Sequence, residues 1–328
     1  MRFFCRALFS LTAPQERVTQ SNAPYAELTK YNHSQKEVIY PMQKLDMTLA
    51  VLTWRAPKTL EASLSSIEKL LPYFDELVLV CQESDPREIE IGEKYGFRIV
   101  ALQENVGIQY GMAECFRNAS NENVLFYEND LVLKVDLESA LASLREASNA
   151  LNNKQVSFVK LRYLPDNARD KSALFDSYWK IHNNQLRRRL AALIRPKKSL
   201  SVVSKSLEYL SEKDITPIGF DRHNDNFLIS TTSHNAWENR AVVTTKAFFE
   251  KLIAFAESHP TMRSVNGKPD LEHPINCKKN RKWYQSLEVS LLIGVPGLFG
   301  HRRFDRAKED EKWVMVDPLD DGGSVEVS

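Results

Sequence analysis

Residues 47–57 read MTLAVLTWRAP, an apolar run that ends in a polar turn and a proline. A short uncharged run closed by such a turn is typical of a strand that is buried on both faces. Pro57 suits the first turn of a helix, where its missing N–H costs nothing. The next apolar residues follow at helical spacing up to Pro72, which predicts one buried helix face: Leu60, Leu64, Ile67 and Leu71. This stretch therefore predicts a strand that leads directly into a helix.

The same alternation continues through residue 130. Further strands are expected at 76–81, 97–102 and 123–127, with helices at about 88–95 and 108–119. Four strands separated by helices within about 85 residues predict an α/β, doubly wound parallel sheet. Ligands bind such sheets beyond the carboxyl ends of the strands, and in this sequence those ends are polar or acidic.

The rest of the chain is less regular. We expect helices at 137–151 and through 248–255, and strands at 156–163, 241–245 and 286–295. Residues 1–45 are polar and aperiodic, so they are interpreted as an N-terminal extension. A basic, helical insertion is expected at about 166–215, and residues 317–328 are expected to form a C-terminal tail. These limits predict one domain over residues 46–316.

Composition excludes several classes of protein. The 328 residues are 43% hydrophobic, which excludes wholesale disorder, and the net charge of +1 provides no general attraction to nucleic acid. No run reaches the roughly 18–20 apolar residues of a membrane span. The four cysteines are far apart, which favours reduced thiols and a cytoplasmic protein: Cys5, Cys81, Cys115 and Cys277.

Motifs for common nucleotide chemistry are missing. The turn after the first strand contains no glycine, so it lacks the G-x-G-x-x-G fingerprint, and no P-loop, H-E-x-x-H or G-x-S-x-G motif occurs. Glu128 and Asp130 instead follow a buried strand, separated only by Asn129. Two carboxylates so placed can hold a divalent cation, although an acidic turn can also simply end the strand.

The order of these motifs resembles the donor-binding half of GT-A-fold glycosyltransferases of the family-2-like group. The matching stretches are Thr53-Trp54-Arg55, Glu83-Ser84-Asp85, Asn105-Val106-Gly107 and the run from Val124 to Asp130. The first carboxylate of the last motif is Glu128 rather than an aspartate, which leaves Asp130 as the more secure metal ligand. Gly297-Leu298-Phe299-Gly300-His301 resembles the late segment that supplies a histidine to the metal, and a surface histidine is the alternative.

The resemblance implies a GT-A-like (Rossmann-like) mixed sheet with helices on both faces. Residues 46–135 would be the nucleotide-sugar-binding half and 136–316 the acceptor half. The implied activity is transfer of a hexosyl or related sugar to an acceptor hydroxyl in glycan biosynthesis, with inversion and with Mn²⁺ or Mg²⁺. Glu128, Asp130 and His301 would bind the metal, and Asp270 or Glu272 would be the catalytic base. The implied donor site is Thr53, Trp54, Arg55, Glu83, Asp85, Asn105, Gly107, Asn129 and Arg302.

Within that site the resemblance implies separate roles. Glu83 or Asp85 would contact the base or ribose of the donor. Arg302 and Arg303 could pair with phosphate oxygens, because arginine presents a fork of donors. For either Asp270 or Glu272 considered alone, the alternative to a catalytic base is a solvated carboxylate in a loop.

Two further features have more than one interpretation. Asp221, His223 and Asp225 are two residues apart and would face one way in an extended segment, so they could bind a second metal or form a polar loop. Residues 180–205 are basic and amphipathic, which fits peripheral contact with an anionic membrane, phosphate binding or a solvated face. The acceptor could be a glycan, a lipid-linked glycan or a protein, and no nucleic-acid-binding module is recognisable.

Two other functions remain open. A nucleotidyltransferase would use a similar sheet, but a glycine-rich basic loop is expected after its first strand and is missing here. A catalytically inactive nucleotide- or carbohydrate-binding protein of the same fold would be favoured by weak metal binding through Glu128.

Overall fold

The computed structural model describes residues 43–164, 190, 194, 219–262, 264–265 and 267–304, and only the backbone of 306–309 and 312–315. The tail at 317–328 and nearly all of the expected extension and basic insertion lie outside these residues.

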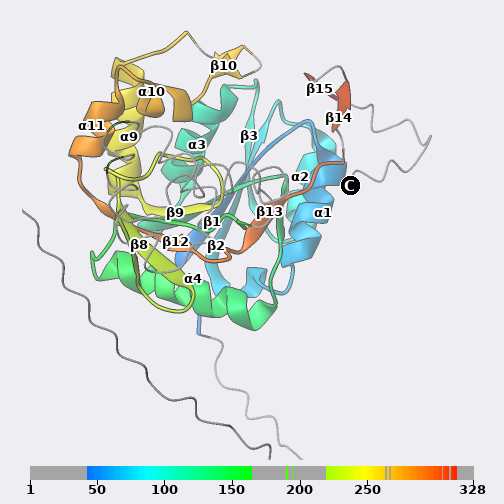
Figure 1. Cartoon of the computed structure of the whole chain (residues 1–328). Coiled ribbons are helices and arrows are strands. Elements are labelled where there is room, and N and C mark those ends of the chain that lie inside the picture. The colour runs from blue at the N-terminus through cyan, green and yellow to red at the C-terminus, as the bar shows by residue number, and fades with distance from the viewer. Residues whose placement is uncertain are drawn as a thin grey trace, which may run out of the picture. The chain divides into compact units, whose positions relative to one another are not determined.

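A nine-stranded mixed sheet forms the centre of the described domain (Figure 1). Its strands are β1 (Leu45–Trp54), β2 (Phe74–Gln82), β3 (Arg98–Leu102), β4 (Asn123–Glu128), β6 (Phe158–Lys160), β7 (Phe220–Arg222), β8 (Phe227–Thr231), β9 (Val242–Thr245) and β12 (Ser290–Gly294). Their spatial order is β3-β2-β1-β4-β9-β6-β12-β8-β7. The first four strands are parallel, while β9 is antiparallel to β4 and to β6. The expected mixed α/β sheet of GT-A type is confirmed.

Helices cover both faces of this sheet. They are α1 (Pro57–Ile67), α2 (Pro86–Lys94), α3 (Gly107–Asn118), α4 (Leu137–Asn152), α9 (Lys246–Ser258), α10 (Glu272–Asn276) and α11 (Arg281–Ser286), with a 3-10 turn, η1, at Leu71–Tyr73. Figure 1 shows α4 below the sheet and α3 and α9 above it. Because side chains alternate along a strand, Ala50 and Leu52 of β1 pack on the α3–α9 side, and Leu49 and Val51 pack on the α1–α4 side.

Most of the expected elements are present, within a few residues of their predicted ends. One expectation is wrong: residues 286–295 are not one strand, because α11 ends at Ser286 and β12 begins only at Ser290. The residues between them include Glu288, whose φ is 50°. A residue with left-handed φ interrupts an extended strand, so only the apolar part of the run joins the sheet.

A short pair of strands places the C-terminal part of the domain next to the end of β4. The strand β5 (Leu131–Leu133) pairs antiparallel with β13 (Phe299–His301), and His301 lies opposite Leu131. This pairing joins segments about 170 residues apart at the carboxyl end of β4. Two smaller hairpins are β10 (Ser264–Val265) with β11 (Lys268–Pro269) and β14 (Arg306–Glu309) with β15 (Lys312–Met315).

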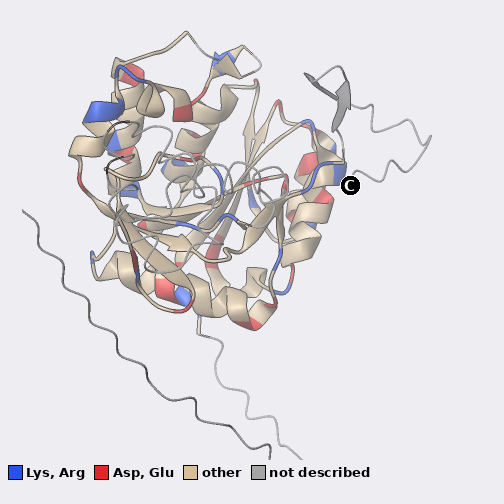
Figure 2. Cartoon of the chain, viewed as in Figure 1, with Lys and Arg blue, Asp and Glu red and all other residues tan. Residues whose placement is uncertain are grey.

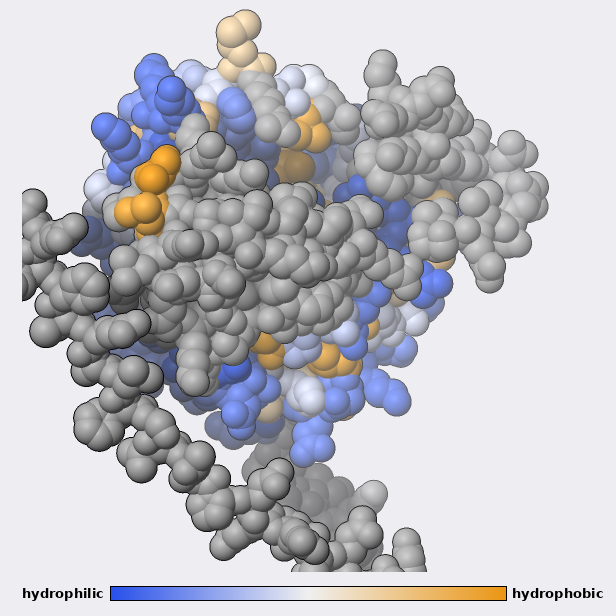
Figure 3. Space-filling model, viewed as in Figure 1, coloured by the Kyte–Doolittle hydropathy of each residue, from blue (hydrophilic) through white to orange (hydrophobic). Residues whose placement is uncertain are grey.

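Charges of both signs are interspersed over the outer helices and turns (Figure 2). On the face in Figure 3, the exposed described residues are mostly hydrophilic, and the hydrophobic ones form small separate patches. Within the described ranges, no helix has the length and apolar character that a bilayer crossing requires.

Candidate active site

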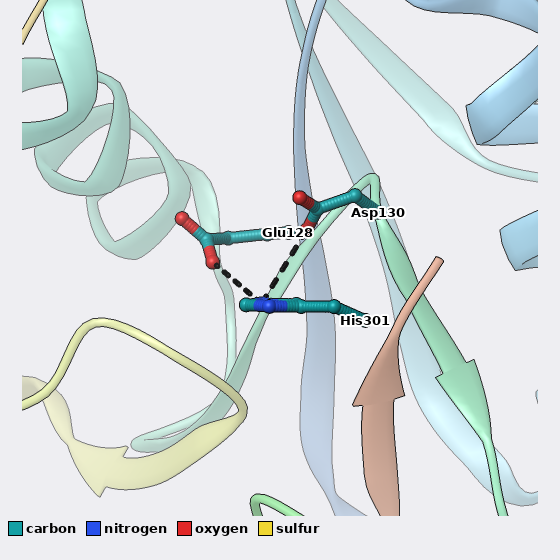
Figure 4. A group of neighbouring side chains, drawn as sticks. All are labelled: Glu128, Asp130 and His301. Atoms are coloured by element: carbon teal, nitrogen blue, oxygen red, sulfur yellow. Dashed lines mark ion pairs between the residues drawn. The ribbon is translucent and has the colours of Figure 1, made fainter. Parts of the chain in front are cut away.

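Three side chains of types that can ligate a metal meet at the carboxyl end of β4. Glu128 ends β4, Asp130 lies in the turn to β5, and His301 ends β13. One ligand atom from each lies within 4.8 Å of the others. Nε2 of His301 is 3.8 Å from Oε2 of Glu128 and 3.7 Å from Oδ1 of Asp130, and Figure 4 shows the three side chains converging. The structure therefore brings together the three residues that the sequence analysis expected to bind the metal.

Two atoms of this trio are buried without a hydrogen-bond partner among the described residues: Oδ1 of Asp130 and Nε2 of His301. A buried polar atom left unpaired costs about 1–3 kcal/mol, so native proteins rarely leave two such atoms side by side. Oxygen and imidazole nitrogen atoms aimed at one point are a donor set for a divalent cation. The residues present therefore fit the metal that the resemblance implies.

The other atoms of Asp130 are held by the segment after β13. Its Oδ2 accepts a hydrogen bond from Nε of Arg303 at 2.5 Å, and its backbone oxygen accepts one from the Arg302 N–H at 2.7 Å. The side chain of Arg302 is exposed and lies over the Phe304 ring, with Cζ 4.7 Å from the ring centroid. Of the two arginines, Arg303 thus contacts the metal trio through its side chain and Arg302 only through its backbone.

A series of buried hydrogen bonds supports the turn between β4 and β5 from inside the protein. Asn129 donates from Nδ2 to Oγ1 of Thr53 at 2.9 Å, and Thr53 donates to Oε1 of Glu88 at 2.5 Å. The same oxygen of Glu88 accepts the Ala56 N–H at 2.9 Å, and burial raises the pKa of Glu88. Thr53 and Asn129 thus connect β1, α2 and the metal turn inside the protein. The sequence analysis missed Glu88, which reads there only as a helix residue.

The remaining expected donor residues gather at the ends of β1, β2 and β3. Arg55 forms an ion pair with Glu83, and the Arg55 guanidinium lies 5.7 Å from the centroid of the Trp54 ring. Arg55 and Glu83 have positive φ values, 47° and 63°, so the two turns are sharp.

Two of these residues mainly shape helix starts. Asp85 caps α2 by accepting the Arg87 N–H at 2.9 Å, and its hydrogen bonds with Arg87 lower its pKa. Asn105 accepts the Gly107 N–H at 2.8 Å at the start of α3. Gly107 has a φ of 83°, and a Cβ there would lie 2.5 Å from Cβ of Lys268, so this position requires glycine.

The two expected base candidates form a separate buried cluster around Asn239. Oδ1 of Asp270 accepts a hydrogen bond from Nδ2 of Asn239 at 3.1 Å and from the Glu272 N–H at 3.2 Å. Oε1 of Glu272 accepts the Asn239 N–H at 2.8 Å. Burial and the negative charges of Asp270, Glu238 and Glu128 raise the pKa of Glu272 to about 7. A carboxyl group with that pKa is suited to proton transfer at neutral pH.

Glu238 differs from Glu272 in its charged neighbours. Its carboxylate lies 3.3 Å from Nη1 of Arg162 and 3.6 Å from Nζ of Lys160. Although burial opposes ionisation, the positive charges of Lys160, Arg162 and Arg240 hold its pKa at about 2. Glu238 and Asn239 were missed by the sequence analysis, since residues 237–240 match no motif and their partners are distant in the chain.

The alternative metal cluster does not form. His223 lies 3.0 Å from Oε1 of Glu146, while Asp221 and Asp225 are exposed. The chain turns back between β7 and β8 at residues 223–226, so the three side chains do not stay on one face of an extended segment. In the described part of the chain, Glu128, Asp130 and His301 are the only such group close enough to share a metal ion.

Comparisons with known proteins give a family match over part of the chain and several partial structural likenesses. Residues 48–193 match the model of glycosyl transferase family 2. The search of curated proteins found no match. Among solved structures, TarS 1–349 of S. aureus is 21% identical, with a TM-score of 0.30 over 35% of each chain. Its complex with UDP-GlcNAc gives the same identity and TM-score over 35% of this chain and 34% of that one.

A mannosyltransferase of Pyrobaculum calidifontis, PcManGT in complex with GDP-Man and Mn²⁺, is 16% identical, with a TM-score of 0.31 over 37% of this chain and 36% of that one. The chain therefore spans about a third of the length of the structures it matches. The match of residues 48–193 and the mixed sheet that these residues begin confirm the resemblance of this part of the chain to GT-A-fold glycosyltransferases of family 2.

Proposed function

We propose that this protein transfers a sugar from a nucleotide-sugar donor to an acceptor hydroxyl, with inversion and with a divalent metal ion. The observation that carries the proposal is the Glu128, Asp130 and His301 trio, which presents two unpaired buried ligand atoms at the end of β4. Ligands of doubly wound sheets bind at this edge, and Glu128 and Asp130 lie within the residues that match the glycosyl transferase family 2 model.

The donor atoms of the trio favour Mn²⁺ over Mg²⁺. Mg²⁺ is bound mainly by oxygen atoms in strict octahedral geometry, whereas the trio contributes one imidazole nitrogen beside two carboxylates. When bound, such an ion offsets negative charge on the diphosphate leaving group. Glu128, Asp130 and His301 hold it, and Arg303 keeps Asp130 oriented through its other oxygen.

The chemical step requires a base on the acceptor side, which we assign to Glu272 or Asp270. The carboxylate takes the proton of the acceptor hydroxyl while the hydroxyl oxygen bonds to the anomeric carbon. The bond from that carbon to the diphosphate breaks, and the nucleoside diphosphate leaves with the bonding electrons. The raised pKa of Glu272 makes it the stronger base of the two when it is ionised.

The donor nucleotide is proposed to lie along the ends of β1 to β3, where Trp54 offers a ring face and Glu83 an acceptor for ribose or base N–H and O–H groups. Arg302 is exposed beside the trio and is our candidate for a phosphate contact. The acceptor is a glycan, a lipid-linked glycan or a protein. Residues 180–205, of which only 190 and 194 are described, are the proposed contact of a cytoplasmic protein with a membrane surface.

A thermal-shift panel tests the donor site. UDP-, GDP-, CMP- and dTDP-sugars are compared with and without Mn²⁺ on wild type, Asp130→Asn and the exposed control Asp225→Asn. A ligand at about 100 times its Kd adds about 2.7 kcal/mol of stability, which is measurable as a rise in Tm. We expect one nucleotide class to stabilise wild type and Asp225→Asn, only with metal, and not to stabilise Asp130→Asn. If no nucleotide stabilises wild type, the proposal is wrong.

Turnover separates an enzyme from a binding protein. Release of nucleoside diphosphate is measured with the donor identified above and a panel of acceptors, and NMR of the product gives the anomeric configuration. An inverted product supports the mechanism. Metal-dependent donor binding without any turnover would instead favour an inactive protein of the same fold.

A further inference from the structure

The side chain of Asn239 lies at the centre of the second cluster, although it is neither acidic nor part of any expected motif. It is only 3% exposed, in the connection between β8 and β9. Asp270 and Glu272 come from the segment that enters α10, about 30 residues later in the chain. Asn239 contacts both carboxyl groups, one through its side chain and one through its backbone N–H.

The orientation of the Asn239 amide is fixed by Trp237. The indole Nε1 of Trp237 donates to Oδ1 of Asn239 at 2.9 Å, and an indole N–H can only donate. The amide oxygen must therefore face Trp237, which leaves Nδ2 facing Oδ1 of Asp270 at 3.1 Å. Trp237 itself is 1% exposed and packs against Phe158 and Phe248, so it cannot easily turn away.

In the resulting hydrogen-bond network, the donor and acceptor of each bond are fixed. Trp237 donates to Asn239, Asn239 donates to Asp270, and the Glu272 N–H donates to the same Asp270 oxygen. The Asn239 N–H then holds Oε1 of Glu272 at 2.8 Å. Asn239 thereby holds two carboxyl groups that would otherwise repel each other. Its side-chain Nδ2 holds Asp270, and its backbone N–H holds Glu272.

We propose that Asn239 is a positioning residue for the glycosyl-transfer step, which orients Asp270 and Glu272 as a pair while Trp237 fixes its amide. This inference rests on the proposed function, because it presumes that one of the two carboxyl groups is the base. Asn239 acts through them and need not touch substrate.

The test uses the full-length protein and the variant Asn239→Asp, which keeps the shape but replaces the Nδ2 donor with an oxygen. A further acid then lies against Asp270, in a cluster whose charges also include Glu272, Glu238 and Glu128. The positive charges of Lys160, Arg162 and Arg240 act on Glu238. We expect kcat at pH 7 to fall by about 10–100-fold and the acidic limb of the pH–rate profile to move to higher pH by about one unit. The metal-dependent Tm shift caused by the donor should stay as in wild type.

Two companion variants keep the test decisive. Asn239→Ala removes the side-chain donor without adding charge, and it serves if the aspartate variant does not fold; we expect a smaller fall in kcat and no loss of the donor-induced Tm shift. Asn235→Asp is the matched control, since Asn235 is 5% exposed in the same connection and its Nδ2 has no partner among the described residues. Its kcat and pH profile should match wild type.

The outcomes separate this inference from the proposed function. A kcat and a pH profile unchanged in both Asn239 variants, in an active wild type, overturn the positioning role alone. Equal losses in Asn239→Asp and Asn235→Asp also overturn it, because they indicate general damage to the connection. A wild type that binds no donor and turns over no substrate removes the proposed function, and the positioning role with it.

Discussion

The domain contains two clusters built around one aspartate and one glutamate, and they differ in whether their polar atoms have hydrogen-bond partners. The trio of Glu128, Asp130 and His301 leaves two buried atoms without hydrogen-bond partners among the described residues. In contrast, Asp270 and Glu272 both accept hydrogen bonds from Asn239, and Asp270 also accepts one from the Glu272 N–H. Under the proposed function, a bound metal ion would complete the first arrangement, because it would satisfy the two atoms that lack hydrogen-bond partners. The second is already satisfied, so it can respond to its surroundings by gaining or losing a proton.

Removing a ligand atom from the trio should have the largest effect. In Asp130→Asn, one oxygen that faces His301 becomes part of a neutral amide, and we expect turnover with Mn²⁺ to fall by about 10³-fold or more, equivalent to several kcal/mol. Mn²⁺ affinity, measured by isothermal titration calorimetry with donor present, should fall in parallel. The exposed Asp225→Asn should retain both, and normal Mn²⁺ affinity in Asp130→Asn would contradict the difference between the clusters.

Changes in the second cluster should affect chemistry without affecting donor binding. Glu272→Gln and Asp270→Asn keep the size of each side chain and remove its basicity, so the variant that loses the base should lose about 10²-fold or more in kcat. Donor affinity, from the metal-dependent Tm shift, should stay near that of wild type in both. If both variants keep wild-type kcat, neither carboxyl group is the base.

The pH dependence of catalysis follows from the raised pKa of Glu272. A base must be ionised, so kcat/KM should rise by about tenfold per pH unit up to about pH 7 and then level off. Glu238→Gln removes a neighbouring negative charge and frees Lys160 and Arg162 from it, so the midpoint should move to lower pH. A midpoint near 4.5 in wild type, or no shift in Glu238→Gln, would argue against this assignment.

Away from the site, Glu76 should change the stability of the fold with pH in the direction opposite to Glu272, and its substitution should have a smaller effect than the changes above. Its carboxylate accepts hydrogen bonds from Thr48, Arg98 and Ser120, which outweigh burial and lower its pKa to about 2. Its stabilising contribution is therefore complete above about pH 4.5 and lost as pH falls toward 2, whereas that of Glu272 is complete below about 4.5 and lost as pH rises through 7.

Glu76→Gln should thus reduce the free energy of unfolding by about 1–2 kcal/mol at pH 7 and by less near pH 2. Urea titrations at both pH values measure the difference. Equal losses at the two pH values would mean that the ionised carboxylate is not what stabilises the fold.

The smallest effect is expected at the donor edge. Arg55 and Glu83 form a partly exposed ion pair, and such pairs contribute at most about 1 kcal/mol, so Glu83→Gln should leave Tm nearly unchanged. If Glu83 contacts the donor, the Kd of the nucleotide should nevertheless rise severalfold, which distinguishes a binding role from a structural one. An unchanged Kd would remove Glu83 from the donor site.

The parallel strands and their helices were predictable from local pattern. Residues 47–54 and 123–127 are mostly apolar runs without a charged residue, and buried parallel strands need such runs, so both were expected where β1 and β4 lie. The run at 286–295 misled the prediction because it begins at the end of α11 and turns at Glu288, so that only Ser290–Gly294 joins the sheet. Periodicity alone does not distinguish these two states in a short apolar segment.

The candidate site was predictable only where its residues are close in sequence. Glu128 and Asp130 are two residues apart after a strand, a spacing that fits either a metal site or an acidic turn, and the family resemblance favoured the metal site. Arg303 was expected to pair with phosphate oxygens, but its contact with Asp130 was not expected. Glu238 and Asn239 carry no signal in the sequence, because each acts on a residue about 30 or more positions away. Even for His301, an open choice between ligand and surface residue could be decided only by the pairing of β13 with β5.

By itself, the sequence determined the alternation of strands and helices, the acidic end of β4 and the absence of a glycine-rich nucleotide turn, because these properties depend on neighbouring residues. Only the tertiary structure decided that His301 faces Asp130, that Glu272 lies among other negative charges, and that Asn239 joins two carboxyl groups. The physical reason is that hydrogen bonds and pKa values depend on distances of a few ångströms, and sequence separation does not report them.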